Sequence, residues 1–543
     1  MIDYEAYRHG SARWATAAEL KRAGLLGAEP TLGYFGNVPL GLRSDAPKIS
    51  VGGSGAGKFR DLLVAMAIGA FLAEHIDHHY FGDSKGEIAG TLAWALIRFG
   101  IYGYFLNPMG LHGLPNHACN PLDMLKPDSP TLRADCKLFA EALLTLSGAS
   151  DGQYFEVVGR RIDAILLEVA VRAFGYVDLP TLYEMLQALS TGGSDWESLR
   201  RSMMEMGGDI AATAAEIEDK RTGAPREWSA VMATILNELS FMAIPQVQAS
   251  TQGGGSERFS LAAVASAEPK IAIFDMIPVE FSELLAPLQR LNITALTLYK
   301  QRAPASGRLH ITIDEAGNLK RFNLLRKLYT LGRGLSCQVH AIYQSTSQLV
   351  ENFGAAGAQT ILGSSQVRQF FGIRDYETAE LVSKMLGRTT LSYANRTYRA
   401  EQRRQGAQAL YKLLHGGDPF EAAFAAAHHG EQAGALEQQP RALLTPDEVL
   451  ALPADRQILF ISGIDVPPIL AERRPYWCAP RLAGLYFPNP FHPPADRVRV
   501  ATRFGSRWRR VVTEDVPFHL TDFPQHDAGY RKIIKGYRYE PPK

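Results

Sequence analysis

The stretch KISVGGSGAGKFRD, residues 48–61, decides the fold class, because a short β-prone run leads into a glycine-rich loop and then an apolar helix. It fits the pattern G-x-x-x-x-G-K, in which backbone N–H groups, a helix N-terminus and a lysine surround phosphate oxygens. A glycine-rich turn with an incidental lysine is the alternative interpretation. The pattern predicts a nucleotide-binding loop formed by Gly52, Gly53, Ser54, Gly55, Ala56, Gly57, Lys58 and Phe59.

The residue after the lysine departs from this pattern. A Ser or Thr usually stands there and its hydroxyl binds Mg²⁺, but this chain has Phe59. Because Mg²⁺ commonly keeps several water ligands, the loss of one hydroxyl should weaken or reposition the metal without abolishing nucleotide binding.

A second acidic site is predicted at the end of another strand, in RLHITIDEAGNL, residues 308–319. Apolar residues alternate along this run and end at Asp314 and Glu315. Asp314 would hold Mg²⁺ through its water shell, and Glu315 would orient or deprotonate the attacking water. A strand that ends in two solvated acids is the alternative.

Composition restricts the class of protein. The chain has 543 residues, which predicts several domains, and its net charge of +1 excludes a uniformly basic nucleic-acid binder. The four cysteines form no C-x-x-C pair, as is typical of reduced thiols. The N-terminus does not resemble a signal peptide, and the longest apolar helix candidate, residues 62–73, is too short to cross a bilayer.

Several ordered blocks carry a family resemblance. They include DSKGE (83–87), NPLDML (120–125), IDEAGNL (313–319), QSTSQL (344–349) and ISGIDVPPI (461–469). Together they resemble the coupling-protein ATPases of type IV secretion and conjugation, the TraG/TraD family, over most of residues 48–490. The resemblance implies an α/β fold: a RecA-like P-loop NTPase core, with a mostly parallel sheet flanked by helices, and an inserted all-α domain.

The resemblance also implies roles for single residues. Gln344 would sense the γ-phosphate, and Arg333 would reach the nucleotide of a neighbouring subunit as an arginine finger; a solvent-facing arginine on a turn is the alternative. Asn107 departs from the family pattern, in which Asp commonly precedes the proline. The nucleotide site or a subunit contact would further include Asp83, Lys85 and Glu87.

The predicted organisation follows from composition and periodicity. Apolar spacings of three and four residues predict an all-helical segment after the first α/β half. The expected parts are a leader (1–47), the first part of the core (48–125), the all-α insertion (126–258), the second part of the core (259–490, with a flexible insertion at 391–440) and a basic aromatic tail (491–543).

The tail combines eleven Lys and Arg residues with six Asp and Glu residues, and aromatic residues are interspersed among them. Such a composition can bind phosphate backbones and stack bases. A solvated basic segment that packs its aromatic residues on the core is the alternative.

The resemblance implies an ATPase that uses ATP and Mg²⁺ and assembles as a homo-hexamer. Its partners would be single-stranded DNA with a relaxase, or protein effectors, and the proteins of a type IV secretion channel. Most relatives carry an N-terminal membrane segment, and the chain resembles their soluble part alone. It would be a cytoplasmic member of the family with membrane contact only through a partner; a truncated form of a longer protein is the alternative. A nucleotide-binding substrate receptor with little hydrolysis, because of Phe59, is the alternative, and a DNA translocase outside secretion is a third option.

Overall fold

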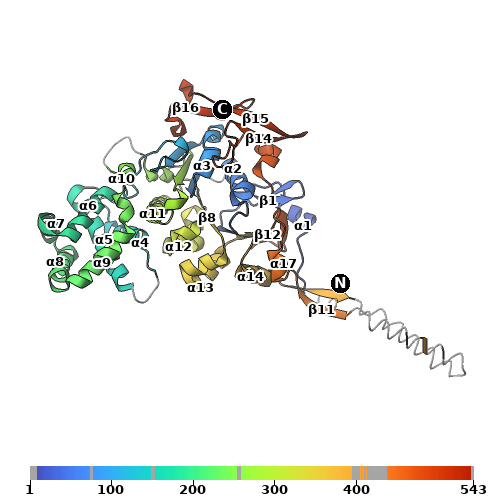
Figure 1. Cartoon of the computed structure of the whole chain (residues 1–543), viewed down its shortest axis with the longest axis horizontal. Helices are drawn as coiled ribbons and strands as arrows, with labels where there is room; N and C mark the ends of the chain where they lie inside the picture. Colours follow the sequence, from blue (N-terminus) through green and yellow to red (C-terminus); the bar gives the residue numbers. More distant parts are fainter. Residues whose placement is uncertain are drawn as a thin grey trace.

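The computed structural model describes residues 9–73, 77–147, 153–253, 259–393, 404, 407–408, 411 and 437–539. Its centre is a sheet of eleven strands (Figure 1). In spatial order these are β2 (Val38–Gly41), β1 (Thr31–Phe35), β13 (Ile469–Glu472), β12 (Arg456–Ile461), β9 (Val367–Phe371), β3 (Lys48–Gly52), β8 (Cys337–Tyr343), β7 (Leu309–Ile313), β4 (His78–Asp83), β6 (Ile271–Met276) and β5 (Tyr102–Leu106).

The seven strands from β9 to β5 run parallel, and the four beyond β9 run antiparallel. Parallel strands need crossover connections, which bury both faces of the sheet under helices. The central strands accordingly consist of buried residues along their whole length. This is the mostly parallel α/β core that the sequence predicts.

Each face of the sheet has its own hydrophobic cluster. Adjacent residues of β4 divide between the two clusters, Tyr80 on one face and Phe81 on the other, as the alternation of a strand requires. Helices α2 (Val64–Leu72) and α3 (Glu87–Leu92) cover the face of Phe81. The opposite face packs against α11 (Ala286–Arg302), α12 (Asn323–Leu331) and α13 (Thr346–Ser364).

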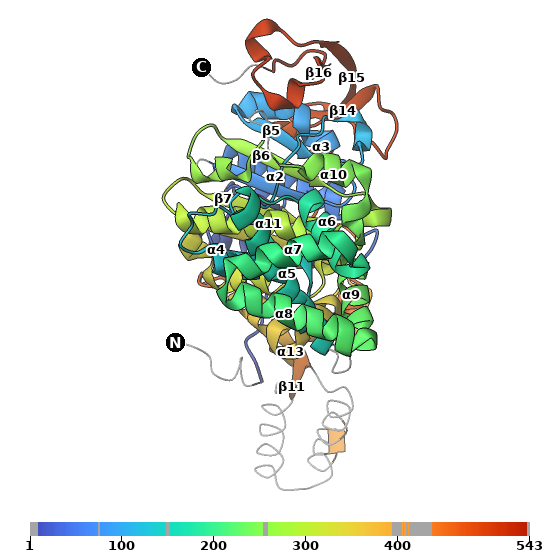
Figure 2. The ribbon, with the colours of Figure 1, turned by 90° about the vertical axis from the view of Figure 1, so that its left-hand side faces the viewer.

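A helical lobe is inserted between β5 and β6 (Figure 2). Within residues 126–258, the described part of the chain contains helices and turns but no strand. Gly192 and Gly207, with φ of 75° and 70°, separate successive helices at angles that other residues rarely adopt. The helices are α4 (Leu132–Leu143), α5 (Gln153–Phe174), α6 (Leu179–Thr191), α7 (Gly193–Met206), α8 (Gly208–Gly223), α9 (Pro225–Glu238) and α10 (Pro245–Thr251).

The first 47 residues, which we expected to form a leader, contribute α1 (Ala17–Arg22) and the edge strands β1 and β2 to the core. The flexible insertion expected at 391–440 lies mostly outside the described residues. At its borders β10 (Arg388–Tyr393) pairs with β11 (Glu437–Ala442), and the flanking helices are α14 (Tyr376–Leu386) and α17 (Pro446–Leu450).

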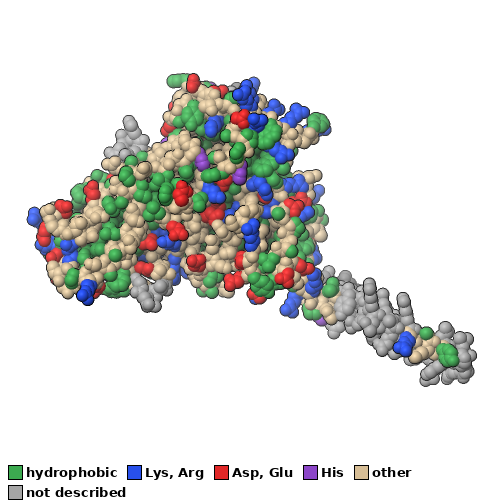
Figure 3. Space-filling view, in the orientation of Figure 1, with side chains coloured by type: hydrophobic (Ala, Val, Ile, Leu, Met, Phe, Trp, Pro, Cys, Tyr) green, Lys and Arg blue, Asp and Glu red, His purple; other side chains and the backbone are tan. Residues whose placement is uncertain are grey.

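The C-terminal segment forms a separate sheet of three strands, β14 (Arg497–Thr502), β15 (Gly505–Asp515) and β16 (Tyr530–Ile534). Buried apolar side chains, among them Val500 and Ile534, join it to the cluster around α2 and α3. Phe504 and Trp508 remain exposed, at 86% and 57%. Lys and Arg side chains gather over this part of the surface (Figure 3). The tail therefore packs part of its apolar surface on the core and presents the rest to solvent.

Among the described residues, no helix combines the length and the apolar character needed to cross a membrane.

Candidate nucleotide-binding site

The predicted phosphate-binding loop connects β3 to a helix that begins at Lys58. The first turn, Lys58–Leu63, has π-helical hydrogen bonding before α2 continues. Gly57 has φ of 79°, and a Cβ on it would lie 2.7 Å from Asp61 Oδ2. A Cβ on Gly53 would lie 2.4 Å from the carbonyl oxygen of Gly372. Glycine is therefore required at position 57 by the conformation of the turn, and at position 53 by the close approach of Gly372, which follows β9.

Three neighbouring strands bring the central polar residues together at their carboxyl ends. Lys58 follows β3, Glu315 follows β7, and Gln344 follows β8, which lies between them. Lys58 Nζ donates to Glu315 Oε1 at 2.6 Å, and Gln344 Nε2 donates to Glu315 Oε2 at 2.8 Å. Both carboxylate oxygens are thus held. Glu315 has φ of 54°, a strained conformation for a non-glycine residue and one that is concentrated at functional sites.

Asp314 lies beside this cluster with one oxygen free. Among the described residues, no donor reaches Asp314 Oδ1, although the atom is buried; Ser84 Oγ lies 3.4 Å from Oδ2. Burial, together with the adjacent Glu315 carboxylate, raises the pKa of Asp314 to about 6. A buried carboxylate oxygen without a hydrogen bond is suited to a divalent cation, and Mg²⁺ prefers oxygen ligands and waters. The residues present therefore fit a magnesium ion.

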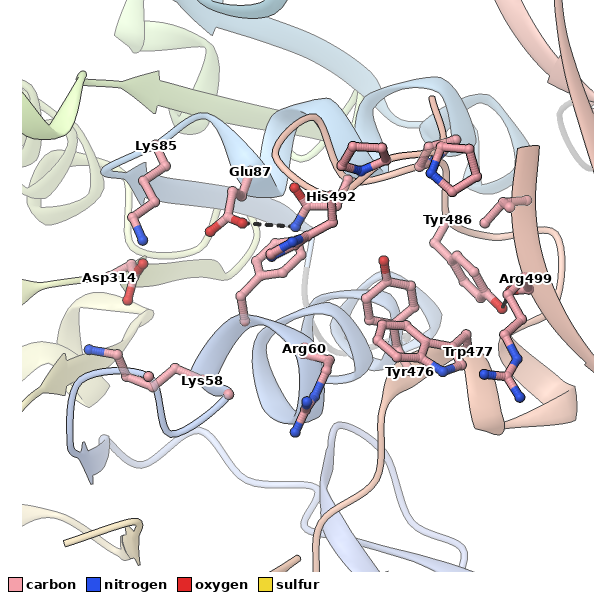
Figure 4. Close-up of a pocket in the computed structure, with 18 of the residues that line it drawn as sticks. Lys58, Arg60, Lys85, Glu87, Asp314, Tyr476, Trp477, Tyr486, His492 and Arg499 are labelled. Atoms are coloured by element: carbon pink, nitrogen blue, oxygen red, sulfur yellow. Dashed lines mark hydrogen bonds between the residues drawn. The ribbon is translucent and has the colours of Figure 1, made fainter. Parts of the chain in front are cut away.

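Asp83 is the last residue of β4, next to β7, and Lys85 and Glu87 follow it, with Glu87 beginning α3. Asp83 accepts a hydrogen bond from the Ala89 backbone N–H at 2.8 Å and so helps to hold the start of α3. Burial raises the pKa of Asp83 to about 7, and the carboxylates of Asp314 and Glu87 act in the same direction. Lys85 lies near Asp314 at one end of a cavity, and Glu87 lies farther along it (Figure 4).

Phe59, where a hydroxyl is expected, contacts an aromatic side chain of the C-terminal half. Its ring meets that of Tyr476 edge-on, with centroids 6.3 Å apart. Phe59 is half-buried and lines the cavity, and it offers no oxygen to a metal. The position that binds metal in typical phosphate loops is here part of an aromatic contact.

Arg333 lies away from this cluster in the same chain. It precedes β8, whereas Gln344 follows that strand, and the seven residues between its ends span roughly 20 Å. The side chain is 71% exposed, and its Nε lies 3.0 Å from Asp45 Oδ1. Arg333 could therefore act only on the nucleotide of another subunit, and its role stays a prediction.

Asn107 has a structural explanation. Its Nδ2 donates to the carbonyl oxygens of Leu111 and Leu114 at 3.1 Å each, and its Oδ1 accepts from the Leu111 N–H at 2.8 Å. An aspartate has no N–H and could not make the first two bonds. Asn107 therefore stabilises the loop that follows β5, which accounts for this departure from the family pattern.

The cluster lies at one end of a cavity of about 650 Å³, a volume typical of small-molecule sites. Asn489 and Glu87 both line it, and Asn489 Nδ2 donates to Glu87 Oε1 at 2.8 Å. Sequence reasoning noted the aromatic and basic tail but not its position beside the phosphate loop. The cavity residues that were not predicted as part of this site are Arg60, Tyr476, Trp477, Tyr486, Pro488, Asn489, His492, Pro493, Pro494, Arg497, Val498, Arg499 and Trp508.

Known structures share this fold. Two structures of the conjugative coupling protein TrwB, one unbound and one in complex with ADP and Mg²⁺, superpose with TM-scores of 0.58 and 0.57. Both are 18% identical in sequence; each match covers 85% of this chain, and 93% and 94% of the respective TrwB chains. The expected RecA-like core with a helical domain is thereby confirmed.

The sequence is also similar to those of named transfer proteins. A probable conjugal transfer protein TraG of Sinorhizobium fredii (strain NBRC 101917 / NGR234) is 26% identical over 242 residues, 44% of this chain and 33% of TraG. Protein VirD4 of Rhizobium radiobacter is 23% identical over 499 residues, 88% of this chain and 65% of VirD4. The chain thus spans between a third and two thirds of these relatives.

The family model for type IV secretory system conjugative DNA transfer matches residues 83–416, more than half of the chain. That range includes Asp314, Glu315, Arg333 and Gln344, and it begins after the phosphate loop. The chain therefore belongs to the type IV coupling proteins of conjugative DNA transfer.

Proposed function

We propose that this coupling protein hydrolyses ATP to recruit and move single-stranded DNA bound to a relaxase, or protein effectors, toward a type IV secretion channel. The observation that carries the proposal is the Lys58–Glu315–Gln344 cluster at the ends of β3, β7 and β8. A lysine, a carboxylate and an amide at adjacent strand ends are the groups that phosphoryl transfer to water needs.

Each group in the cluster would have a separate role in the reaction. The loop N–H groups and the Lys58 ammonium bind the phosphate oxygens, so that Lys58 exchanges the Glu315 carboxylate for a phosphate. Glu315 Oε1 is then available to accept a proton from the attacking water, while Gln344 keeps the other oxygen in place. Because Lys58 pairs with Glu315 in the absence of nucleotide, phosphate binding would free the Glu315 carboxylate to act as the general base.

Asp314 would hold Mg²⁺, directly or through water, with Oδ1 as the donor atom. When bound, Mg²⁺ supplies positive charge that neutralises the β- and γ-phosphate oxygens. Phe59 has no oxygen to offer, so the position that a hydroxyl takes elsewhere would be left to water. Asp83, Lys85 and Glu87 would complete the surroundings of the phosphates.

Assembly as a homo-hexamer would bring the Arg333 of one subunit to the nucleotide of the next. Its pairing with Asp45 is exposed, and pairs of this kind stabilise a conformation by less than about 1 kcal/mol, so the guanidinium can be withdrawn from it. The ATPase would lie in the bacterial cytoplasm and bind proteins of the secretion channel. It would contact the inner membrane only through such partners.

A nucleotide-responsive substrate receptor that hydrolyses little ATP is the second candidate. The observation in its favour is Phe59, which leaves the metal one protein ligand short and is engaged with Tyr476.

Steady-state ATP turnover with and without single-stranded DNA separates the two candidates. We expect Lys58→Ala and Glu315→Gln each to lower turnover by at least about 100-fold, because each removes a group used in phosphoryl transfer. Glu315→Gln should still bind ATP. The matched control is Glu351→Gln, on the exposed surface of α13, which should behave as the wild type. Equal and negligible turnover in the wild type and both variants would favour the receptor.

A further inference from the structure

We propose that the C-terminal segment forms the nucleoside half of the nucleotide site, with the base of ATP stacked on Trp508 and enclosed by the aromatic residues around Tyr476. This inference rests on the proposed nucleotide site and extends it. It assigns a ligand to the β14–β15 hairpin, and it makes the nucleoside, as well as the triphosphate, a determinant of binding.

The cavity has two chemically different ends (Figure 4). Lys58, Lys85 and Asp314 lie at one end, and Trp477 and Arg499 lie at the other. The polar end suits a triphosphate with its metal. A nucleoside extends from the α-phosphate, so a nucleotide bound by the loop would direct its ribose and base along the remaining length of the cavity.

An aromatic wall connects the two ends. It starts at Phe59, which meets Tyr476 edge-on, and Tyr476 in turn contacts Trp477 and Tyr486 with ring centroids 5.0 and 4.6 Å apart. Tyr486 donates to the carbonyl oxygen of Arg499 in β14 at 2.7 Å. The hairpin is thereby attached to the same wall that begins beside the phosphate loop.

Residues of the β14–β15 hairpin line the far end of the cavity. Arg499 lies opposite Trp508 in the antiparallel register, and paired residues project from the same face. Both line the cavity, as does Arg497. Arg499 Nε donates to Ser506 Oγ at 2.9 Å, which steadies the guanidinium. Val500, one residue along, is buried in the core and anchors the strand.

The Trp508 indole combines a large aromatic surface with 57% exposure at the edge of a cavity. A purine stacked on it would bury that surface, and neighbouring guanidiniums can stack on the base or contact a ribose or phosphate oxygen. A cavity of about 650 Å³ has room for one nucleotide.

The test compares two ligands by isothermal titration calorimetry on the full chain: ATP and inorganic tripolyphosphate, which has the phosphates without the nucleoside. We expect Trp508→Ala to raise the Kd for ATP roughly tenfold and to leave the Kd for tripolyphosphate unchanged, as base–aromatic stacking predicts. Trp508→Phe should restore most of the affinity. The control Phe504→Ala changes an aromatic residue at the tip of the same hairpin, outside the cavity, and should have no effect on either ligand.

The outcomes separate failure of the inference from failure of the proposed function. An unchanged Kd for ATP in Trp508→Ala, or equal weakening of both ligands, would overturn the nucleoside assignment while leaving the phosphate site intact. Weaker binding of single-stranded DNA by Trp508→Ala, with ATP unaffected, would overturn it in favour of a nucleic-acid surface. If the wild type bound neither ligand, or if Lys58→Ala changed neither Kd, the phosphate site itself would be refuted.

Discussion

The two ends of the cavity differ in how they are built. At the phosphate end, side chains project from the carboxyl ends of parallel strands, and the Lys58 and Glu315 side chains are only 11% and 19% exposed. At the far end, Arg499 and Trp508 belong to a surface hairpin that is covered on one face only. Enclosed charges interact strongly, so the first end is suited to catalysis, whereas the second offers contact area and is suited to recognition.

The difference also indicates which part of the site tolerates amino-acid substitution. Residues at parallel strand ends are held by the sheet and by hydrogen bonds that a substitution would break. The hairpin packs through valines on its inner face, so its outer face can change without disturbing the core. We expect substitutions at the phosphate end to alter turnover and stability, and those at the far end to alter ligand preference.

The largest effect concerns a residue at the phosphate end, which connects the phosphate loop to the antiparallel part of the sheet. Arg473, after β13, donates to the Ala56 carbonyl oxygen of the phosphate loop at 2.6 Å, lies 4.4 Å from the ring centroid of Phe371 and faces Asp61 at 3.8 Å. We expect Arg473→Met to lower the free energy of unfolding by about 3 kcal/mol, because it leaves buried acceptors without their donor. Chemical denaturation would measure this.

The neighbouring Arg474→Met provides the control. Its guanidinium pairs with Glu472 at a partly exposed site, so the loss should stay below about 1 kcal/mol. Equally small effects of the two substitutions would mean that the loop is held without the C-terminal part of the sheet.

A smaller effect, dependent on pH, is expected at the phosphate end. Because the pKa of Asp83 is raised to about 7, the folded protein keeps a proton that the unfolded chain releases above pH 4, and this residue opposes folding increasingly as the pH rises to about 7. Asp83→Asn cannot ionise and retains an oxygen for the Ala89 N–H. The variant should therefore gain stability over the wild type between about pH 5 and 7, on the order of 2 kcal/mol.

Thermal unfolding across this pH range would measure the gain, with the exposed Asp219→Asn as a variant expected to leave the midpoint unchanged. A difference between Asp83→Asn and the wild type that did not vary with pH would show that Asp83 is ionised in the folded protein throughout.

The smallest effect is expected at Phe59, which lies between the two ends of the cavity. Phe59→Thr would supply the missing hydroxyl and remove the ring contact with Tyr476. We expect the affinity for ATP to fall roughly threefold, the scale of one aromatic pair, with no loss for tripolyphosphate. Equilibrium titration of both ligands would measure it. Tighter ATP binding would instead mean that the metal ligand outweighs the aromatic contact.

Much of the phosphate end could be predicted from the sequence. Lys58 lies in a short glycine pattern, and Asp314 and Glu315 end an alternating apolar run, so each is recognisable without its neighbours. Gln344 and Arg333 needed the family resemblance. The structure explains Asn107 through three hydrogen bonds within its own loop, which residue type alone could not reveal.

The sequence by itself determined the class of fold and the triphosphate end, because a glycine loop and acidic strand ends are local patterns whose chemistry depends on a few consecutive residues. Only the tertiary structure decided that β1 and β2 extend the sheet and that residues 476–508 form the other half of the cavity. Contacts between segments more than 400 residues apart, such as Phe59 with Tyr476, arise from how the whole chain packs and leave no periodic signal in the sequence.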